Sequence, residues 1–262
     1  EKNKEILSIE DEIAELEKFR DLAESIKHNA KGEKLLTALK EGFSKMDKHA
    51  NKKAIIFTES TRTQNYLFNL LSEQYPDKIV LFNGSNNDET SNKVYKSWLE
   101  KNRGTDKVTG SPTADKRAAL VEYFRNEATI MIATEAAAEG INLQFCSLLI
   151  NYDLPWNPQR IEQRIGRCHR YGQKYDVVVV NFLNVKNAAD IRVFQLLAEK
   201  FKLFSGVFGA SDDVLGSIES GVDFEKRIAE IYQKYRTEQE RIEQFDLLQT
   251  ELDEQSNSKM LS

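Results

Sequence analysis

Strands and helices alternate along the middle of the chain, and this alternation restricts the fold more than any other feature of the sequence. Ala54–Thr58 is a short apolar run bounded by polar residues, which is typical of a strand buried on both faces. A helix from Thr61 to Glu73 and a strand at Ile79–Phe82 follow it. Because strand–helix–strand units form parallel sheets with right-handed crossovers, we expect a doubly wound α/β fold. Further strands are predicted at Thr129–Ala133, Ser147–Asn151 and Asp176–Leu183.

Helical spacing of apolar residues surrounds this predicted sheet. Residues 5–29 have apolar side chains three or four positions apart, and Lys31-Gly32 is expected to break the helix before a second one at 33–46. The first stripe must pack either on the main lobe or on a neighbour. The stripe near the carboxyl terminus favours packing within the chain over a coiled-coil seam. Further helices are predicted at 115–125, 188–201, 212–219 and 223–254.

Residues 85–114 are polar and rich in Gly, Asn, Ser and Thr around one predicted helix, Asn92–Lys101. We predict an insertion at the edge of the sheet, and the sequence leaves open whether its helix docks a partner. The predicted organisation is a helical lead-in, a lobe that contains the sheet, and a helical extension. These parts cover residues 1–30, 31–208 and 209–262.

The charge distribution restricts the kinds of partner that the chain can bind. Its 262 residues carry a net charge of −5, which argues against a generally basic nucleic-acid coat. Between Trp156 and Lys174, however, there are five Lys or Arg residues and one acidic residue. A locally basic surface on an acidic protein suits a transient contact with a phosphate backbone.

Cysteine and histidine usage predicts neither a disulfide framework nor a metal site. Cys146 and Cys168 lack metal-ligand spacing, and we expect both to be small core residues in a reducing compartment. The three histidines form no cluster in the sequence. No apolar run approaches the roughly 18 residues that span a bilayer, and no signal peptide is visible, so we expect no membrane association.

The segment Q-R-I-G-R-C-H-R at residues 163–170 has the pattern of an anion-binding helix. At about 100° per residue, Gln163, Arg167 and Arg170 fall within roughly 60° of one another. Arginine suits phosphate because its charged, planar fork matches phosphate oxygens. A solvated basic face is the alternative, and the motifs upstream favour the functional interpretation. The apolar side chains nearly opposite, expected to face the core, are Ile161, Ile165 and Cys168.

Motifs on both sides of this helix carry a family resemblance. Ala133-Thr134 is followed by E-G-I-N-L at 139–143, N-Y-D at 151–153 and W-N-P at 156–158, and Y-G-Q follows the helix at 171–173. This series resembles the second RecA-like lobe of superfamily-two helicases over about residues 31–185. W-N-P together with the arginine helix and its G-Q tail is similar to the Swi/Snf-type DNA translocases, and within them to the bacterial RNA-polymerase-associated remodellers. The resemblance implies a RecA-like, mostly parallel sheet with helical extensions at both termini.

The resemblance also implies ATP hydrolysis, but with most of the machinery elsewhere. Neither a G-x-x-x-x-G-K-[ST] motif nor a D-E-x-[HD] box occurs in the 262 residues. We therefore expect ATP and Mg²⁺ to be held mainly by an N-terminal RecA-like lobe of a longer parent chain, and this chain to be inactive alone. The absence of an initial methionine agrees with that expectation.

The resemblance assigns roles to several side chains near the nucleotide. Arg167 takes the part of the arginine finger and Arg170 assists it, while Gln163 orders the pair. Gly140 is expected to allow a sharp backbone turn beside the nucleotide. Asn142 is either a turn former or a nucleotide-site residue, and no function is assigned to Glu139.

Nucleic acid is expected across the carboxyl ends of the strands, where parallel sheets place their ligands. Contacts there position the phosphate backbone without reading its sequence. Capping of strand or helix ends is the alternative for the hydroxyl and arginine side chains, and packing of a turn onto the core is the alternative for the tryptophan. The residues predicted to contact nucleic acid are Thr58, Ser60, Arg62, Gly84, Thr134 and Trp156.

These observations predict the second motor lobe of an ATP-driven double-stranded DNA translocase that remodels protein–DNA complexes. Two alternatives remain: a strand-separating DNA or RNA helicase, and a non-catalytic RecA-like interaction module. The expected partners are the N-terminal lobe, double-stranded DNA, and RNA polymerase or another protein. The expected location is the bacterial cytoplasm, in association with the nucleoid.

Overall fold

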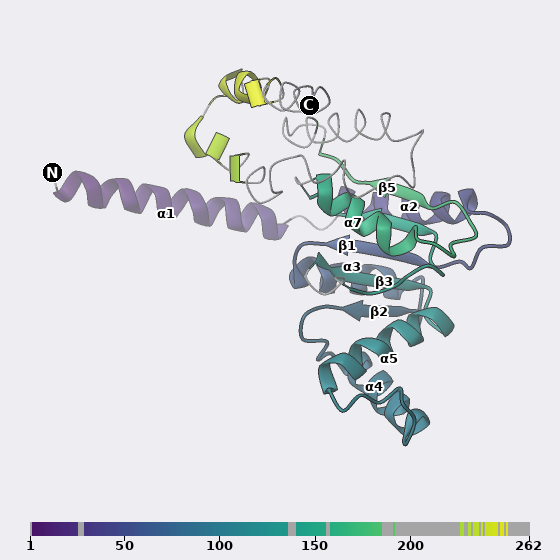
Figure 1. Ribbon diagram of the computed structural model, residues 1–262. Helices are drawn as coiled ribbons and strands as arrows, with labels where there is room; N and C mark the ends of the chain where they lie inside the picture. Colours follow the sequence, from purple (N-terminus) through teal and green to yellow (C-terminus); the bar gives the residue numbers. More distant parts are fainter. Residues whose placement is uncertain are drawn as a thin grey trace, which may run out of the picture. The chain divides into compact units, whose positions relative to one another are not determined.

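Five parallel strands form one sheet in the described part of the chain (Figure 1). The strand order is β2-β3-β1-β4-β5, and every neighbouring pair is parallel, which confirms the predicted doubly wound fold. The strands are β1 (Ala54–Thr58), β2 (Ile79–Phe82), β3 (Ile130–Thr134), β4 (Leu148–Asn151) and β5 (Val178–Asn181). The computed structural model describes residues 2–25, 29–135, 140–155, 158–184 and 191, and separate positions between 226 and 250.

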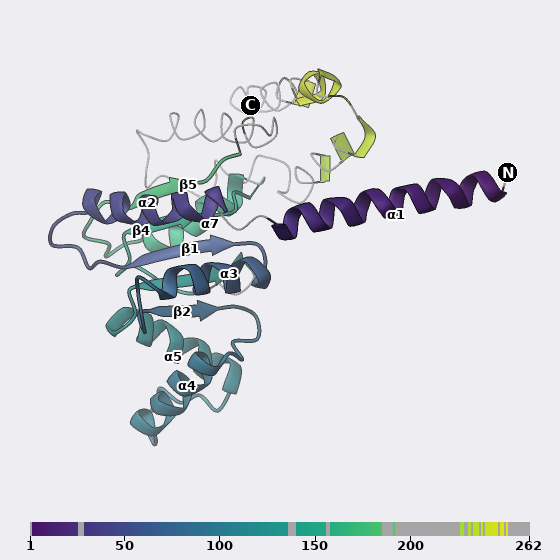
Figure 2. The ribbon, with the colours of Figure 1, turned by 180° about the vertical axis from the view of Figure 1, so that it is seen from behind.

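Helices cover both faces of this sheet. The strands β1 to β4 are buried throughout, whereas the edge strand β5 is half-buried. Helices α5 and α7 pack on one face, where Phe124 and Ile161 join Phe57 of β1 in a single buried cluster. Helix α3 lies on the opposite face, as the two opposed views show (Figures 1 and 2). The helices are α3 (Thr61–Ser72), α4 (Glu89–Asn102), α5 (Pro112–Asn126) and α7 (Pro158–Cys168).

The chain divides into two compact units, residues 1–41 and 42–262. The first unit contains α1 (Lys2–Ser25) and most of α2 (Ala30–Lys45). Asn29 caps α2, because its Oδ1 accepts hydrogen bonds from the amides of Lys31 and Gly32 at 3.0 and 3.3 Å. The predicted break at Lys31-Gly32 is therefore wrong, since both residues lie inside α2. The apolar side chains along α1 that the structure describes are 51–62% exposed: Ile13, Leu16, Phe19 and Leu22.

Gly42, near the end of α2, belongs to the second unit. A Cβ atom at this position would lie 2.8 Å from Cδ1 of Leu148 on β4. A larger residue at this position would therefore force the end of the Leu148 side chain to move. The last turn of α2 thus packs against β4 within the second unit.

The segment predicted to be an insertion, residues 85–114, contacts α5 at two places. The indole Nε1 of Trp98 donates to Glu122 at 3.0 Å, so α4 is fixed on α5. Helix α5 begins at Pro112 rather than at the predicted Asp115, because Ser111 occupies the cap position and proline is favoured in a first turn. The carboxylate of Asp115 accepts hydrogen bonds from Thr109 within the preceding loop.

The described residues near the carboxyl terminus include buried apolar side chains at Ile231, Phe245 and Leu248. The predicted unbroken helix at 223–254 is wrong. Thr237 lies in a bend and forms a reciprocal capping box with Glu240, which starts a new helix. The helices predicted at 188–201 and 212–219 lie outside the described residues, apart from position 191. No helix among the described residues has the length and apolar character needed to cross a membrane.

Candidate functional site

Helix α7 has one buried and one accessible side, as its sequence predicted. Ile161 and Cys168 are fully buried and Ile165 is 8% exposed, which confirms the apolar stripe. On the other side Gln163 is exposed and Arg167 is partly buried. The helix therefore fixes the direction of Arg167 by packing its opposite stripe into the core.

The end of α7 corrects the prediction for Arg170. The helix stops at Cys168, so Arg170 lies exposed in the following bend and does not share the helical stripe. The last carbonyl groups find partners elsewhere: the amide of Leu143 donates to Arg167 at 2.9 Å, and Nε2 of Gln173 donates to Cys168 at 3.1 Å. These groups satisfy the last carbonyls of α7, so the helix can end at Cys168 without leaving them unpaired.

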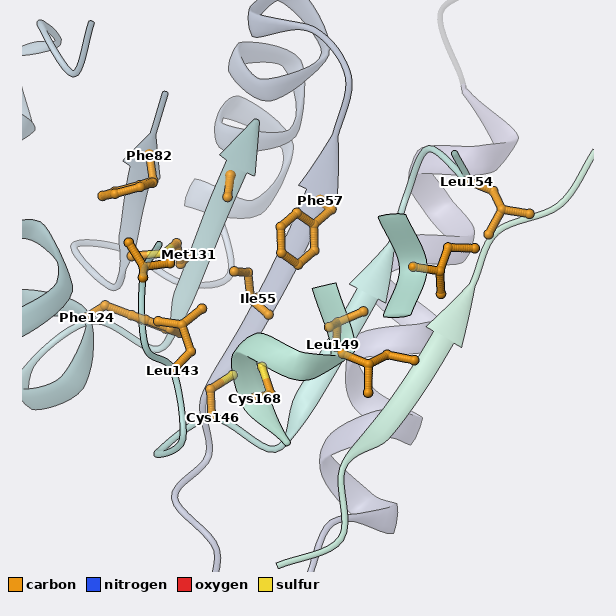
Figure 3. Packing of buried hydrophobic residues seen from close by; sticks show 14 of the residues in the cluster. Ile55, Phe57, Phe82, Phe124, Met131, Leu143, Cys146, Leu149, Leu154 and Cys168 are labelled. Atoms are coloured by element: carbon orange, nitrogen blue, oxygen red, sulfur yellow. The ribbon is translucent and has the colours of Figure 1, made fainter. Parts of the chain in front are cut away.

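The two cysteines join this helix end to the sheet. Cys146 and Cys168 are both fully buried, which confirms them as core residues (Figure 3). Hydrogen bonding to Cys146, with burial, raises the pKa of the Cys168 thiol well above its ordinary value. The Cys168 thiol is therefore protonated at neutral pH and behaves as a small apolar group.

The loop before β4 contains the other predicted nucleotide-side residues. Gly140 is exposed with a φ of 77°, a conformation that disfavours side chains, although a Cβ atom there would meet no neighbour within 4 Å. Oδ1 of Asn142 accepts from the amide of Gln144 at 3.1 Å, so Asn142 does form a turn. Its nucleotide role stays a prediction. Residues 136–139, which include Glu139, lie outside the described residues.

Two of the predicted nucleic-acid residues are neighbours at the carboxyl edge of the sheet. Thr58 and Thr134 pair in register at the ends of β1 and β3, and both are buried. The hydroxyl of Thr58 donates to Oδ2 of Asp153 at 2.6 Å. Thr58 therefore lies beneath the surface that a phosphate would reach, and its hydrogen bond stabilises the edge of the sheet.

The remaining predicted contacts differ in their surroundings. Ser60 caps α3, because its Oγ accepts from the amide of Thr63 at 3.0 Å, so the capping alternative describes this side chain. Arg62 and Gly84 are exposed at the same edge. Trp156 lies outside the described residues. The structure thus brings Thr58, Thr134, Ser60, Arg62 and Gly84 to one edge, and their contact with nucleic acid stays a prediction.

The sequence reasoning missed Arg164, which is 2% exposed. Its guanidinium forms an ion pair with Glu135, donates to Oδ1 of Asn151 at 2.8 Å and to the carbonyl of Asp153 at 3.0 Å. The same group lies 4.8 Å from the ring centre of Phe57. The sequence does indicate this burial: at about 100° per residue, Arg164 falls between Arg167 and Cys168 around the helix, beside the buried stripe.

Three acidic residues lie near this arginine. Glu59, Glu135 and Asp153 come from the residues that follow β1, β3 and β4. Partial desolvation and the neighbouring Asp153 raise the pKa of Glu59, while the Arg164 guanidinium acts in the opposite direction. The edge of the sheet beneath the predicted nucleic-acid contacts is therefore acidic, with a single buried guanidinium at its centre.

In the described part of the chain, no group of three or more His, Cys, Asp or Glu residues has the arrangement of a metal site. A pocket of about 380 Å³ lies between α4 and α5, lined by residues such as Lys93, Trp98 and Glu127. None of the predicted site residues lines it.

Comparison with known proteins agrees with this geometry. Residues 63–172 match the family described as the helicase conserved C-terminal domain. The ATP-dependent helicase YqhH of Bacillus subtilis (strain 168) is 39% identical over 172 residues, which cover 65% of this chain and 30% of YqhH.

Two further relatives are named for different functions. The ATP-dependent RNA helicase RhlB of Shewanella halifaxensis is 35% identical over 125 residues, 47% of this chain and 28% of RhlB. The RNA polymerase-associated protein RapA of Vibrio cholerae serotype O1 (strain M66-2) is 46% identical over 65 residues, 25% of this chain and 7% of RapA. The chain therefore spans less than a third of the length of each of these relatives. Residues 63–172 are thus similar to helicase C-terminal domains, on a doubly wound parallel sheet, and part of the chain is similar in sequence to ATP-dependent helicases.

Proposed function

We propose that this chain is the second motor lobe of an ATP-dependent, Swi/Snf-type translocase that moves along double-stranded DNA. In this proposal α7 supplies the arginine finger, and the carboxyl edge of the sheet supplies part of the nucleic-acid track. ATP and Mg²⁺ are held mainly by an N-terminal RecA-like lobe. The proposed enzyme thus needs both lobes for hydrolysis.

The two-sided character of α7 is the observation that carries the proposal. Its apolar stripe is buried, so the partly buried Arg167 is held on the accessible side by a rigid element. A guanidinium held in this way stabilises the charge of a phosphoryl-transfer transition state without reorganising, which contributes about 10³–10⁵ to the rate in comparable systems. Arg170, in the bend after the helix, assists Arg167.

The sequence around α7 supports duplex translocation over strand separation. The W-N-P turn at 156–158 and the G-Q tail at 172–173 resemble translocases, and the chain is 46% identical to RapA over 65 residues. RNA polymerase as a partner, and a location in the bacterial cytoplasm near the nucleoid, are parts of this proposal that rest on the same likeness.

An RNA helicase is the second candidate, because RhlB is similar to this chain over a longer stretch than RapA is. The non-catalytic interaction module is less well supported. A scaffold has no need of an arginine that a packed helix holds on its accessible side.

Two assays run side by side, with protein that contains both lobes, test the proposal. A translocase displaces the third strand of a DNA triplex but leaves a forked duplex paired. We expect triplex displacement, ATP turnover stimulated by double-stranded DNA, and no turnover by the 262-residue chain alone. Efficient unwinding without triplex displacement, or stimulation by single-stranded RNA only, would instead identify the helicase candidate.

A further inference from the structure

Arg164 carries a buried charge, whereas the two arginines predicted to act on the nucleotide, Arg167 and Arg170, lie on accessible parts of the lobe. Arg164 heads the largest fully buried side chains among the described residues. Removing a guanidinium from water is costly unless charge and hydrogen bonds replace the solvent. Here Glu135 supplies the opposite charge, and Asn151 and Asp153 supply oxygen acceptors.

These partners belong to three different strands. Glu135 directly follows β3, Asn151 ends β4, and Phe57 in β1 lies beneath the guanidinium plane at 4.8 Å. Arg164 itself is on α7, one turn before Arg167. A single side chain therefore ties the helix of the predicted finger to the carboxyl ends of the three central strands.

The same partners are neighbours of the predicted nucleic-acid edge. Glu135 is adjacent to Thr134, and Asp153 accepts the hydroxyl of Thr58 at 2.6 Å. A shift of either strand end would therefore move a group that holds Arg164. Because a buried ion pair adds little net stability compared with apolar packing, its main physical effect is to fix orientation.

We propose that Arg164 is a positioning residue that couples occupancy of the nucleic-acid edge to the placement of Arg167. The coupling runs from the ends of β1 and β3 through Asp153 and Glu135 to the guanidinium, and from there along α7. This inference rests on the proposed function, in which the edge binds nucleic acid and Arg167 reaches ATP.

Glu135→Gln tests the coupling with little change of shape, because glutamine keeps an acceptor oxygen and removes the charge. The protein with both lobes is assayed for kcat with and without saturating duplex DNA, for the KM of ATP and for the DNA concentration at half-saturation. We expect the fold-stimulation of kcat by DNA to fall by about tenfold or more, while both concentrations stay within about twofold. Arg164→Lys should behave alike, since one ammonium cannot reach all three acceptors in a planar fork.

Glu127→Gln is the matched control. Glu127 is an exposed carboxylate before the amino end of β3, at the opposite edge of the sheet from Glu135. Its stimulation should equal that of the wild type. Unchanged stimulation in Glu135→Gln would overturn the proposal, and so would an equal loss of basal and stimulated turnover, which indicates a structural role alone.

Failure of the proposed function gives a different result. If single-stranded RNA stimulates the wild type and duplex DNA does not, the translocase proposal is wrong, and the same comparison made with RNA still decides the coupling. Hydrogen exchange of α7 in the 262-residue chain supplies a second readout, in which Glu135→Gln should speed exchange in α7 but not in β3. Identical exchange in wild type and variant contradicts the positioning role, whichever nucleic acid is bound.

Discussion

The backbone amide of Leu143 donates a hydrogen bond of 2.9 Å to the carbonyl oxygen of Arg167. The loop that leads into β4 therefore holds the last turn of the arginine helix. A second bond, from the amide of Cys146 to Leu143 at 2.8 Å, closes the loop on itself. The position of Arg167 thus depends on contacts outside its own helix.

Gln173 is the side chain that completes this helix end. Its Nε2 donates to the carbonyls of Cys146 and Cys168 at 3.3 and 3.1 Å. Gln173→Ala leaves both carbonyls without this partner, so we expect the free energy of unfolding to fall by about 1–2 kcal/mol. Urea denaturation measures the change, with the exposed neighbour Lys174→Ala as control. Equal stability of the two variants would show that the amide bonds contribute nothing.

Two glycines at the carboxyl edge should respond differently to alanine. Gly140 has a φ of 77°, whereas Gly84 does not have a positive φ, and a Cβ atom at either site would meet nothing within 4 Å. Backbone strain alone should therefore lower the stability of Gly140→Ala by about 1 kcal/mol, and Gly84→Ala should be close to neutral. Thermal unfolding of both variants checks this, and a larger loss at Gly84 would contradict it.

Glu59 should make stability depend on pH. Partial desolvation and Asp153 raise its folded-state pKa above the ordinary 4.5. Above the folded-state pKa the carboxylate is charged in both states, and only the folded state bears the cost; below 4.5 it is protonated in both states and the cost disappears. Glu59→Gln should therefore stabilise the protein at pH 7 and have less effect near pH 4.

Denaturation of wild type and Glu59→Gln at the two pH values measures this difference. The matched control is Glu73→Gln, which removes an exposed carboxylate at the end of α3. A stabilisation by Glu59→Gln that is larger at pH 4 than at pH 7 would show that the cause is not the charge of Glu59.

Much of the sheet could be predicted because each central strand is an apolar run buried on both faces. The prediction for β1 matches its observed bounds, and Ser147–Asn151 differs from β4 by one residue at its start. The buried stripe of α7 followed from helical periodicity in the same way. Patterns of this kind depend on local residue order, which the sequence contains.

The errors lie where a distant or polar contact decides the structure. Arg170 was placed on the helix because periodicity cannot show that Leu143 and Gln173 end it at Cys168. Arg164 was missed because charged residues are buried only when partners from several elements meet, and those partners are far apart in the sequence. The break near Thr237 could have been predicted, because Thr237 and Glu240 have the sequence spacing of a capping box.

The central claim is that Arg167 acts on ATP, and its direct test is the turnover of Arg167→Ala in the protein with both lobes. We expect kcat to fall by at least about 10³ while nucleotide binding stays near that of the wild type, because the first lobe holds the nucleotide. Arg167→Lys should restore little of the activity, since a point charge does not reproduce the planar fork. Equal kcat for the wild type and Arg167→Ala would show that the arginine face of α7 is only solvated surface.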